Sequence, residues 1–260
     1  MADAFYVPDG ADRFISTEWT VGPWSRESQH AGPPAALLGR AIERAVGRDD
    51  VQVVRSTFEI LRPVPVAPLQ VAAEVVRPGR SVVLAEASLS DEQGVVMHAR
   101  AWSIRTAELE LEQVVHETPP SSDPEAGSEV DLLVTDETSY LRAMEWRFVR
   151  GSWLELGPAT AWARMRVSLV EGEEISPLSR VLALADSGNG ISASVDFSQW
   201  VFINPDLSVY LHRMPQGEWI CLDAQTTVEP TGIGLATSVL ADQSGVIGRG
   251  LQSLFIGPRP

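Results

Sequence analysis

The chain contains no lysine, one cysteine and four scattered histidines. All 20 basic residues are arginine, so Schiff-base chemistry on a lysine is excluded. Cys221 has no second cysteine with which to form a disulfide or a cysteine-based metal site. The histidines do not follow a metal-ligand spacing; they are His30, His98, His116 and His212. The sequence therefore predicts a fold that needs neither a disulfide nor a metal.

Long apolar runs are also missing. No segment approaches the roughly 20 consecutive apolar residues that span a bilayer, although 44% of the residues are hydrophobic. The first ten residues, MADAFYVPDG, carry acids where a secretory signal peptide has basic residues. These features predict a cytoplasmic protein without a membrane span. Its apolar residues suffice for one large core or two small ones.

Positive charge is scarce as well, since the net charge is −15. Nucleic-acid binding relies on clustered basic residues, so we expect no nucleic-acid partner. Ten acids and no bases fall between Ala107 and Tyr140, in a stretch rich in Pro, Ser and Gly with little periodicity. Such a composition is typical of a solvated connector. The sequence thus predicts an acidic linker, residues 109–139, between two units of similar size.

The two units resemble each other at a fixed spacing. Residues 56–106 align without a gap with residues 207–257 when Gly94 is placed on Gly245, an offset of 151 residues. The turn sequences DEQG and DQSG then coincide, each between two β-rich runs. Eight positions are identical, among them Arg62 with Arg213, Asp91 with Asp242, and Gly94 with Gly245. This alignment predicts a tandem duplication.

Each unit contains one helical pattern followed by β-rich runs. Residues 30–47 and 176–194 carry apolar residues at helical spacing, and Ser176 with Pro177 forms a helix-start signal. The β-rich runs are residues 51–64, 69–79, 81–90 and 94–105 in the first unit, and 200–205, 207–213, 217–230, 232–241 and 245–256 in the second. This order predicts an α+β fold whose sheets wrap their helices and pair edge to edge. A β-barrel or sandwich with incidental helices is the alternative.

Three segments carry a resemblance to a known family: STFEILRPV, YLHRMPQGEWICLDA and GRGLQSLFI. With them the chain resembles the type II (TesB-like) acyl-CoA thioesterases, in a branch typical of actinobacteria. The resemblance implies an α+β double hotdog fold, with hotdog units at residues 1–108 and 140–260. It also implies an acyl-CoA substrate, hydrolysis without a covalent nucleophile or cofactor, and a homo-oligomer of two or more chains.

The family holds its water with an Asp, a Thr or Ser, and a Gln. The segment LALADSGNG supplies Asp186, and GLQSLF supplies Gln252. The hydroxyl position falls on Asn204 in FINPDLSVYLHR, and Ser253 stands where the family has a Glu after the Gln. An amide can position a water but cannot relay a proton as a hydroxyl does. The two departures keep open a second hypothesis, a non-hydrolysing acyl-CoA or fatty-acyl binding protein.

The residues themselves permit a catalytic and a structural interpretation. Asp186 interrupts an apolar helical face, which suits a general base, but it would also suit a residue that ends the helix and binds the following turn. The backbone N–H of Gly32, at a helix start, is a candidate oxyanion donor or merely part of the helix start. Gln252 aligns with Ala101 of the first unit, so only the second unit carries the polar set.

Four further residues or sets of residues suggest weaker alternatives. His30 invites a hydratase mechanism, but the motif of hotdog hydratases is missing and a helix-start role suits it better. Cys221 lies in a strand without a histidine partner, which favours a buried, inert thiol. Strand alternation allows one of two adjacent threonines to face the cleft. Those threonines are Thr226 and Thr227, and the tryptophans considered for an acyl slot are Trp153, Trp162 and Trp200.

Overall fold

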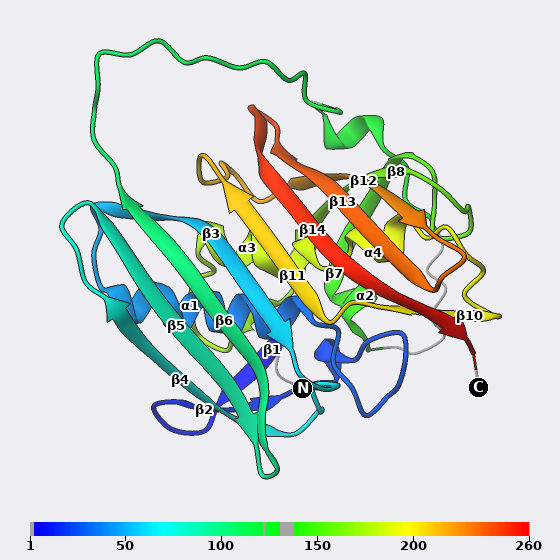
Figure 1. The fold of residues 1–260 in the computed structure, drawn as a ribbon, viewed down its shortest axis with the longest axis horizontal. Helices are drawn as coiled ribbons and strands as arrows, with labels where there is room; N and C mark the ends of the chain where they lie inside the picture. The colour runs from blue at the N-terminus through cyan, green and yellow to red at the C-terminus, as the bar shows by residue number, and fades with distance from the viewer. Residues whose placement is uncertain (1–2, 122, 131–137, 260) are drawn as a thin grey trace.

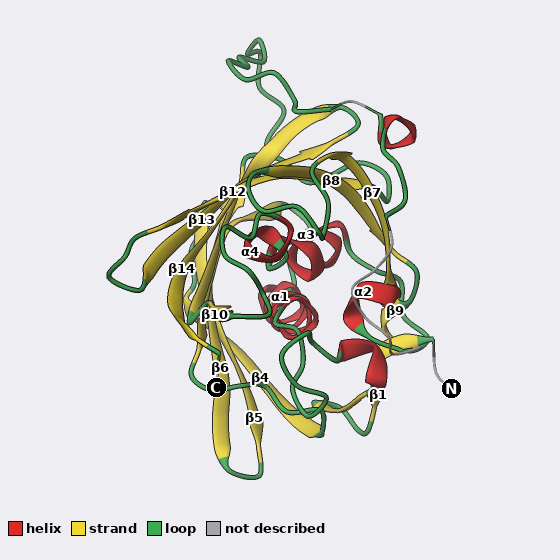
Figure 2. Ribbon diagram, turned by 90° about the vertical axis from the view of Figure 1, so that its right-hand side faces the viewer, coloured by secondary structure: helices red, strands yellow, loops and turns green. Residues whose placement is uncertain are grey.

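The structure, a computed structural model, describes residues 3–121, 123–130 and 138–259. Its strands form one 14-stranded sheet within these residues. The sheet curves around the helices, which lie on its inner side (Figure 1, Figure 2). The predicted α+β double hotdog is therefore confirmed, and the alternative in which the helices are incidental is wrong because the sheet encloses them.

The first half contributes six strands and one long helix. The helix is α1 (Gly32–Val46), and a short 3₁₀ helix, η1 (Glu18–Thr20), precedes it. The strands are β1 (Ala4–Pro8), β2 (Arg13–Ser16), β3 (Val51–Ile60), β4 (Pro68–Arg77), β5 (Val82–Asp91) and β6 (Gly94–Arg105).

The second half contributes eight strands and three short helices. The helices are α2 (Tyr140–Ala143), α3 (Pro177–Ala185) and α4 (Gly188–Ile191), and the connector holds a 3₁₀ helix, η2 (Pro124–Ala126). The strands are β7 (Met144–Arg150), β8 (Ala159–Met165), β9 (Ser168–Val170), β10 (Trp200–Ile203), β11 (Asp206–Leu211), β12 (Ile220–Val228), β13 (Ile233–Asp242) and β14 (Gly245–Pro258).

The strand order is symmetric about the centre of the sheet. It runs β7-β8-β12-β13-β14-β11 in the second half and continues β3-β6-β5-β4-β2-β1 in the first, so equivalent strands stand at equal distances from the middle. Two second-half strands lie outside this symmetric order: β9 is added beside β1, and β10 pairs with β14. The two central strands, β11 and β3, pair antiparallel with Ser208 opposite Thr57. These two residues are 151 positions apart, which is the offset of the sequence alignment. The structure thus supports the tandem duplication.

A side-chain clamp is repeated at equivalent positions of the halves. Arg213 binds both carboxylate oxygens of Asp242, at 2.5 and 2.6 Å, and the carbonyl oxygen of Gly245 at 2.9 Å. In the first half Arg62 binds both oxygens of Asp91 and, at 3.2 Å, the carbonyl oxygen of Gly94. The two glycines have φ angles of 128° and 114°, which side chains with a Cβ rarely adopt. The matched DQSG and DEQG turns therefore share one structural basis.

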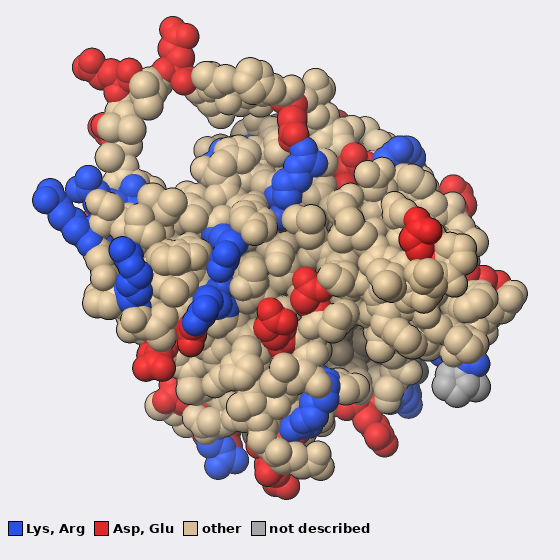
Figure 3. Space-filling model, in the orientation of Figure 1, with Lys and Arg blue, Asp and Glu red and all other residues tan. Residues whose placement is uncertain are grey.

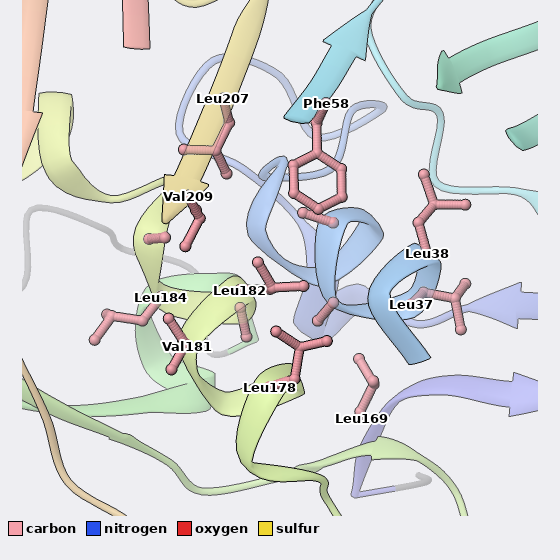
Figure 4. Close-up of a cluster of buried hydrophobic side chains, with 14 of the residues drawn as sticks. Leu37, Leu38, Phe58, Leu169, Leu178, Val181, Leu182, Leu184, Leu207 and Val209 are labelled. Atoms are coloured by element: carbon pink, nitrogen blue, oxygen red, sulfur yellow. The ribbon is translucent and has the colours of Figure 1, made fainter. Parts of the chain in front are cut away.

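One main core joins the two halves between the sheet and the helices. It includes Leu37 and Leu38 of α1, Leu178 and Leu182 of α3, and Phe58 of β3, as Figure 4 shows. The helices α1 and α3 pack closely because α1 has glycines at the contact. A Cβ on Gly39 would lie 2.3 Å from Leu182 Cδ1. The glycines therefore bring the start of α1 close to α3.

Some local expectations differ from the structure. Ser176 caps α3 as predicted, since its Oγ accepts a hydrogen bond from Ser179 N at 3.1 Å. The helix predicted over residues 176–194 is instead interrupted after Ala185 and resumes at Gly188. The outer strands β1, β2, β7, β8 and β9 were not predicted at all. β1 and β2 precede α1, and β7, β8 and β9 precede α3. β9 also links the two halves in space, because it pairs in parallel with β1.

Candidate active site

The break between α3 and α4 presents Asp186. Its backbone ends α3, and its side chain is 5% exposed. Oδ1 accepts two hydrogen bonds, from Asn204 Nδ2 at 2.8 Å and from Gln252 Nε2 at 3.1 Å. The three predicted site residues of the second half therefore converge, although they come from three separate elements. Asp186 also ends α3, as the structural interpretation predicted, and its catalytic role stays a prediction.

Gln252 is fixed in position by contacts at both ends of its amide. Nε2 also donates to the carbonyl oxygen of Asp186 at 3.0 Å, and Oε1 accepts from Asn189 N at 3.1 Å. Gly188 makes room for this arrangement, because a Cβ there would lie 2.5 Å from Ser238 Oγ and 3.1 Å from Gln252 Oε1. The hydrogens of Gln252 Nε2 are thus directed to Asp186 and not to a water.

Asn204 lies between β10 and β11 and donates to the same carboxylate oxygen as Gln252. Besides Asp186 Oδ1, its Nδ2 binds the carbonyl oxygen of Asp206 at 3.0 Å. Its Oδ1 is 3.5 Å from Asn189 Nδ2, the outer limit of a hydrogen bond, and so keeps capacity to accept from another donor. The two amides together immobilise Asp186 Oδ1 and leave Oδ2 to other partners.

The first half brings the start of α1 to the same place. Gly32 packs against α3 so closely that a Cβ would lie 2.1 Å from the carbonyl oxygen of Ala183. The Gly32 N–H points to His30 Nδ1 at a distance of 3.1 Å. The predicted oxyanion donor therefore lies at a helix N-terminus, and in this structure it is engaged by a side chain of its own loop.

His30 is a site residue that sequence reasoning set aside. Its Nδ1 lies 3.3 Å from Asp186 Oδ2, and its ring stacks on Tyr140 with centroids 3.7 Å apart and planes 9° apart. The Tyr140 hydroxyl binds the carbonyl oxygen of Ala183 at 2.9 Å and Ser187 Oγ at 2.8 Å. The residues come together only in the fold, since 156 positions separate His30 from Asp186. The HAG sequence before α1 was the one available signal.

Burial sets the electrostatics of this cluster. Desolvation lowers the pKa of His30 below its usual value, and the nearby Asp186 carboxylate offsets this only partly. Desolvation also raises the pKa of the Tyr140 phenol, so it stays protonated. At neutral pH His30 is therefore uncharged, and its single ring proton can reside on either nitrogen.

Other residues considered from the sequence lie elsewhere. Cys221 is fully buried, and burial with the nearby Asp223 raises the pKa of its thiol to about 12, which excludes a thiolate nucleophile. Thr226 faces inward, with Oγ1 2.8 Å from Ser192 Oγ, whereas Thr227 is exposed. Of the three tryptophans, Trp153 lies beside α4, at Gly190. Trp162 is fully buried in a small separate cluster, and Trp200 is 39% exposed.

A shallow groove opens on the outer face of the sheet. Its volume is about 550 Å³, and residues of both halves line it, among them Arg55, Trp102, Tyr210 and Arg249. Arg249 also pairs with Glu117 of the connector. Figure 3 shows this face, where arginine and acidic side chains are interspersed. Because side chains alternate along a strand, Arg249 and Gln252 lie on opposite faces of β14. The groove is therefore separate from Asp186.

No described residues form a group of three His, Cys, Asp or Glu that could hold a metal ion. In the described ranges, no helix is long and apolar enough to cross a bilayer.

Comparison with known families identifies the chain's relatives. Residues 20–104 match the N-terminal domain of acyl-CoA thioesterases, and residues 114–256 match the C-terminal domain. The chain belongs to the acyl-CoA thioesterase family. The predicted family is thereby confirmed, and with it the assignment of the chain as a thioester hydrolase. A comparison with curated proteins found no match.

Solved structures share the fold over nearly the whole chain. A protein assigned as a thioesterase II from Thermobifida fusca is 16% identical, with a TM-score of 0.77 over 97% of this chain and 95% of that one. A protein assigned as a thioesterase from Novosphingobium aromaticivorans is 22% identical, with a TM-score of 0.76 over 96% and 98%. The acyl-CoA thioesterase II TesB2 of Mycobacterium marinum is 14% identical, with a TM-score of 0.66 over 99% and 96%. At these identities the likeness shows the fold.

Proposed function

We propose that the chain hydrolyses acyl-CoA thioesters to a free acid and CoA with a water that Asp186 activates. The observation that carries this proposal is the asymmetric environment of a buried carboxylate. Two amides, from Asn204 and Gln252, occupy Oδ1. Among the described residues, Oδ2 has one polar partner, His30 Nδ1 at 3.3 Å. Oδ2 is therefore the oxygen that accepts a proton from the water.

The reaction follows from this asymmetry. Asp186 Oδ2 takes a proton as the water oxygen forms a bond to the thioester carbon. The developing oxyanion is stabilised by the N–H of Gly32 at the positive end of α1. The tetrahedral intermediate then collapses, the C–S bond breaks, and the CoA thiolate takes up the proton that Asp186 received. Asn204 and Gln252 keep the carboxylate in place, and Asn204 Oδ1 accepts from the second hydrogen of the water.

The asparagine in place of a hydroxyl is compatible with this mechanism. The direct transfer between water and Asp186 needs no relay through Asn204, and the amide still offers an acceptor. The two hotdog units, residues 1–108 and 140–260, then have separate tasks. The second supplies the base and its supports, and the first supplies Gly32. Residues 109–139 connect them.

The test is release of free CoA thiol from a panel of acyl-CoAs, short to long and aromatic. We expect the wild type to turn over at least one of them and Asp186→Asn to lose this turnover while it still binds acyl-CoA. Asp49→Asn, which alters an exposed carboxylate, is the matched control and should behave as wild type. Turnover by Asp186→Asn at the wild-type rate would refute the mechanism. Binding without turnover by the wild type would favour the acyl-CoA binding protein.

The family resemblance also predicts a homo-oligomer of two or more chains. Light scattering after size-exclusion chromatography tests this, and a mass of one 28.2-kDa chain would contradict it.

A further inference from the structure

His30 Nδ1 faces two groups that make incompatible demands on it. The Gly32 N–H, at 3.1 Å, requires a lone pair on Nδ1. The Asp186 carboxylate, whose Oδ2 lies at 3.3 Å, requires a proton there. An imidazole nitrogen has a single in-plane position, which holds either a lone pair or a proton. Nδ1 can therefore serve one of these partners at a time.

The residues packed around His30 fix its ring in a position where Nδ1 faces both groups. The His30 ring lies flat on Tyr140, and the Tyr140 hydroxyl is fixed by two hydrogen bonds. The backbone N–H of His30 is bound to the carbonyl oxygen of Thr20 at 2.8 Å. The side chain is 11% exposed, and the described residues give Nε2 no hydrogen-bond partner. The proton can thus move between Nδ1 and Nε2 through solvent, while the ring stays in place.

Each choice has a consequence for the reaction. With the lone pair on Nδ1, the Gly32 N–H is occupied, and the lone pair faces the Asp186 carboxylate unfavourably. With the proton on Nδ1, His30 donates to Oδ2 and orients it, and the Gly32 N–H loses its acceptor and becomes free for a carbonyl oxygen. Both the oriented base and the free oxyanion donor therefore belong to one tautomer.

We propose that His30 is a positioning residue that couples the two sides of the site: a proton on Nδ1 aligns Asp186 Oδ2 and at the same time releases the Gly32 N–H to bind the thioester carbonyl. The inference rests on the proposed function and adds a residue that the family comparison does not assign. Substrate binding selects the Nδ1–H tautomer, because a carbonyl oxygen competes with Nδ1 for the Gly32 N–H.

Two titratable groups face His30, namely Asp186 at the end of α3 and Tyr140 of α2. Tyr140 stays neutral because burial raises the pKa of its phenol. Burial lowers the pKa of His30, so the imidazolium forms only as the pH falls below the ordinary histidine range. It then donates to Oδ2 as a charged group and makes this oxygen a poorer base. Wild-type kcat/KM should therefore decline on the acid side as His30 is protonated.

The decisive variant is His30→Asn. An amide places either an oxygen or a nitrogen at the position of Nδ1. It exchanges the two only by turning over as a whole, and it has no proton that moves through solvent and no cationic form, so the coupling through a proton is lost. We expect kcat to fall about 10²-fold, the effect of losing one oxyanion donor, with KM changed less than about threefold. The acid limb of kcat/KM that belongs to His30 should disappear. His98→Asn, the same substitution at an exposed position of β6, is the control.

A spectroscopic readout separates coupling from a purely structural role. In protein labelled with ¹⁵N-histidine, the His30 signals are those that disappear in His30→Asn. We expect the Nδ1 shift of the free protein to be that of an unprotonated nitrogen, and to move to that of a protonated nitrogen when a non-hydrolysable acyl-CoA analogue with an intact carbonyl binds. An analogue without the carbonyl should leave the tautomer unchanged.

The outcomes distinguish this inference from the proposed function. If Asp186→Asn is inactive but His30→Asn keeps the wild-type kcat and pH profile, the coupling is wrong and the mechanism stands. A tautomer that is unchanged by the carbonyl-containing analogue also overturns the coupling. If Asp186→Asn is active, the proposed function itself fails.

Discussion

The two halves share a fold but bury different chemistry at equivalent positions. With the offset of 151 residues, Gln252 corresponds to Ala101, Ser238 to Ala87 and Asn204 to Val53. All three first-half residues are buried and apolar, with exposures of 0%, 4% and 6%. Gln252, equally buried at 2%, makes three hydrogen bonds. A buried amide needs such partners, and a buried alanine needs none.

This difference shows how a duplicated unit came to hold one site. In the proposed mechanism the first half serves as an apolar wall and supplies the start of α1, and the second half supplies Asp186 as the base together with the two amides that hold it. The backbone also differs between the two halves at the position of Asn204. Its counterpart lies at an irregularity in β3, between Val53 and Arg55, and in the second half the same place separates β10 from β11. Such an irregularity redirects a side chain.

The largest expected effect comes from making the second half like the first. Gln252→Ala removes a donor to Asp186 Oδ1 and leaves Asn189 N without its acceptor. We expect kcat to fall about 10³-fold, because the base is no longer held. The measurement is thiol release under saturating acyl-CoA. Gln225→Ala, at an exposed position of β12, should keep the wild-type kcat. A kcat within about threefold of wild type for Gln252→Ala would show that the alanine of the first half serves as well as the glutamine at this position.

The repeated clamps give the next comparison. Asp242 is fully buried and accepts from Arg213, Gln216 N and Ser244 N. Asp91 is less buried, and its backbone donor is Gln93 N. Removal of one partner of a buried pair leaves the other uncompensated. Asp242→Ala should therefore lower the free energy of unfolding by about 3 kcal/mol, and Asp91→Ala by clearly less, in urea denaturation. Equal losses would contradict this ranking.

The clamp at Asp242 also predicts how the stability of the fold depends on pH. Burial raises the pKa of Asp242, but the hydrogen bonds from Arg213 and two backbone N–H groups outweigh it, so its pKa is lowered overall. A carboxylate with a lowered pKa stabilises the folded state above its unfolded pKa, about 3.9, and this contribution is lost as the pH falls through the lower folded value. The stability difference between wild type and Asp242→Asn should be constant near neutral pH and shrink below about pH 4. A difference that grows on acidification would reverse the sign and disprove the assignment.

The smallest predicted effect concerns the two helix starts. The N-cap of α3 is Ser176, whereas α1 begins at Ala31 without a side-chain cap and with two prolines. Ser176→Ala should lower the free energy of unfolding by about 1 kcal/mol. Thermal unfolding followed by circular dichroism measures this. Ser198→Ala, on an exposed loop, serves as a control. No change in the Ser176 variant would mean that Pro177 alone defines the start of α3.

Part of the fold was predictable because its signals are local. The ten-residue β5 and β13 alternate in burial over their first eight residues and have a Gly-containing turn on one side, and the alignment placed them on each other. β1 and β2 contain five and four residues, too few for a reliable periodicity, and their pairing partners are distant in sequence. The end of α3 at Asp186 was one of two interpretations of the sequence, because a Gly-rich stretch after Asp186 is compatible with both a continuing and a broken helix.

The site was predictable to a similar degree. Asp186, Asn204 and Gln252 became candidates because the family resemblance gave each a local motif, and the structure brings the three into contact. His30 was set aside because its local sequence suits a helix start, and that role is also real: its Nδ1 accepts the Gly32 N–H. Its proximity to Asp186 depends on the close packing of α1 on α3, which Gly32 and Gly39 permit.

The sequence by itself determined the duplication, the central strands, the capped start of α3 and the polar residues of the second half, because each depends on neighbours along the chain. The tertiary structure decided which oxygen of Asp186 is occupied, that the amides bind the carboxylate, and that His30 stands between Asp186 and the Gly32 amide. The contacts of Asp186 join residues 18 to 156 positions apart, and only the packing of two helices inside a shared sheet brings them within hydrogen-bond distance.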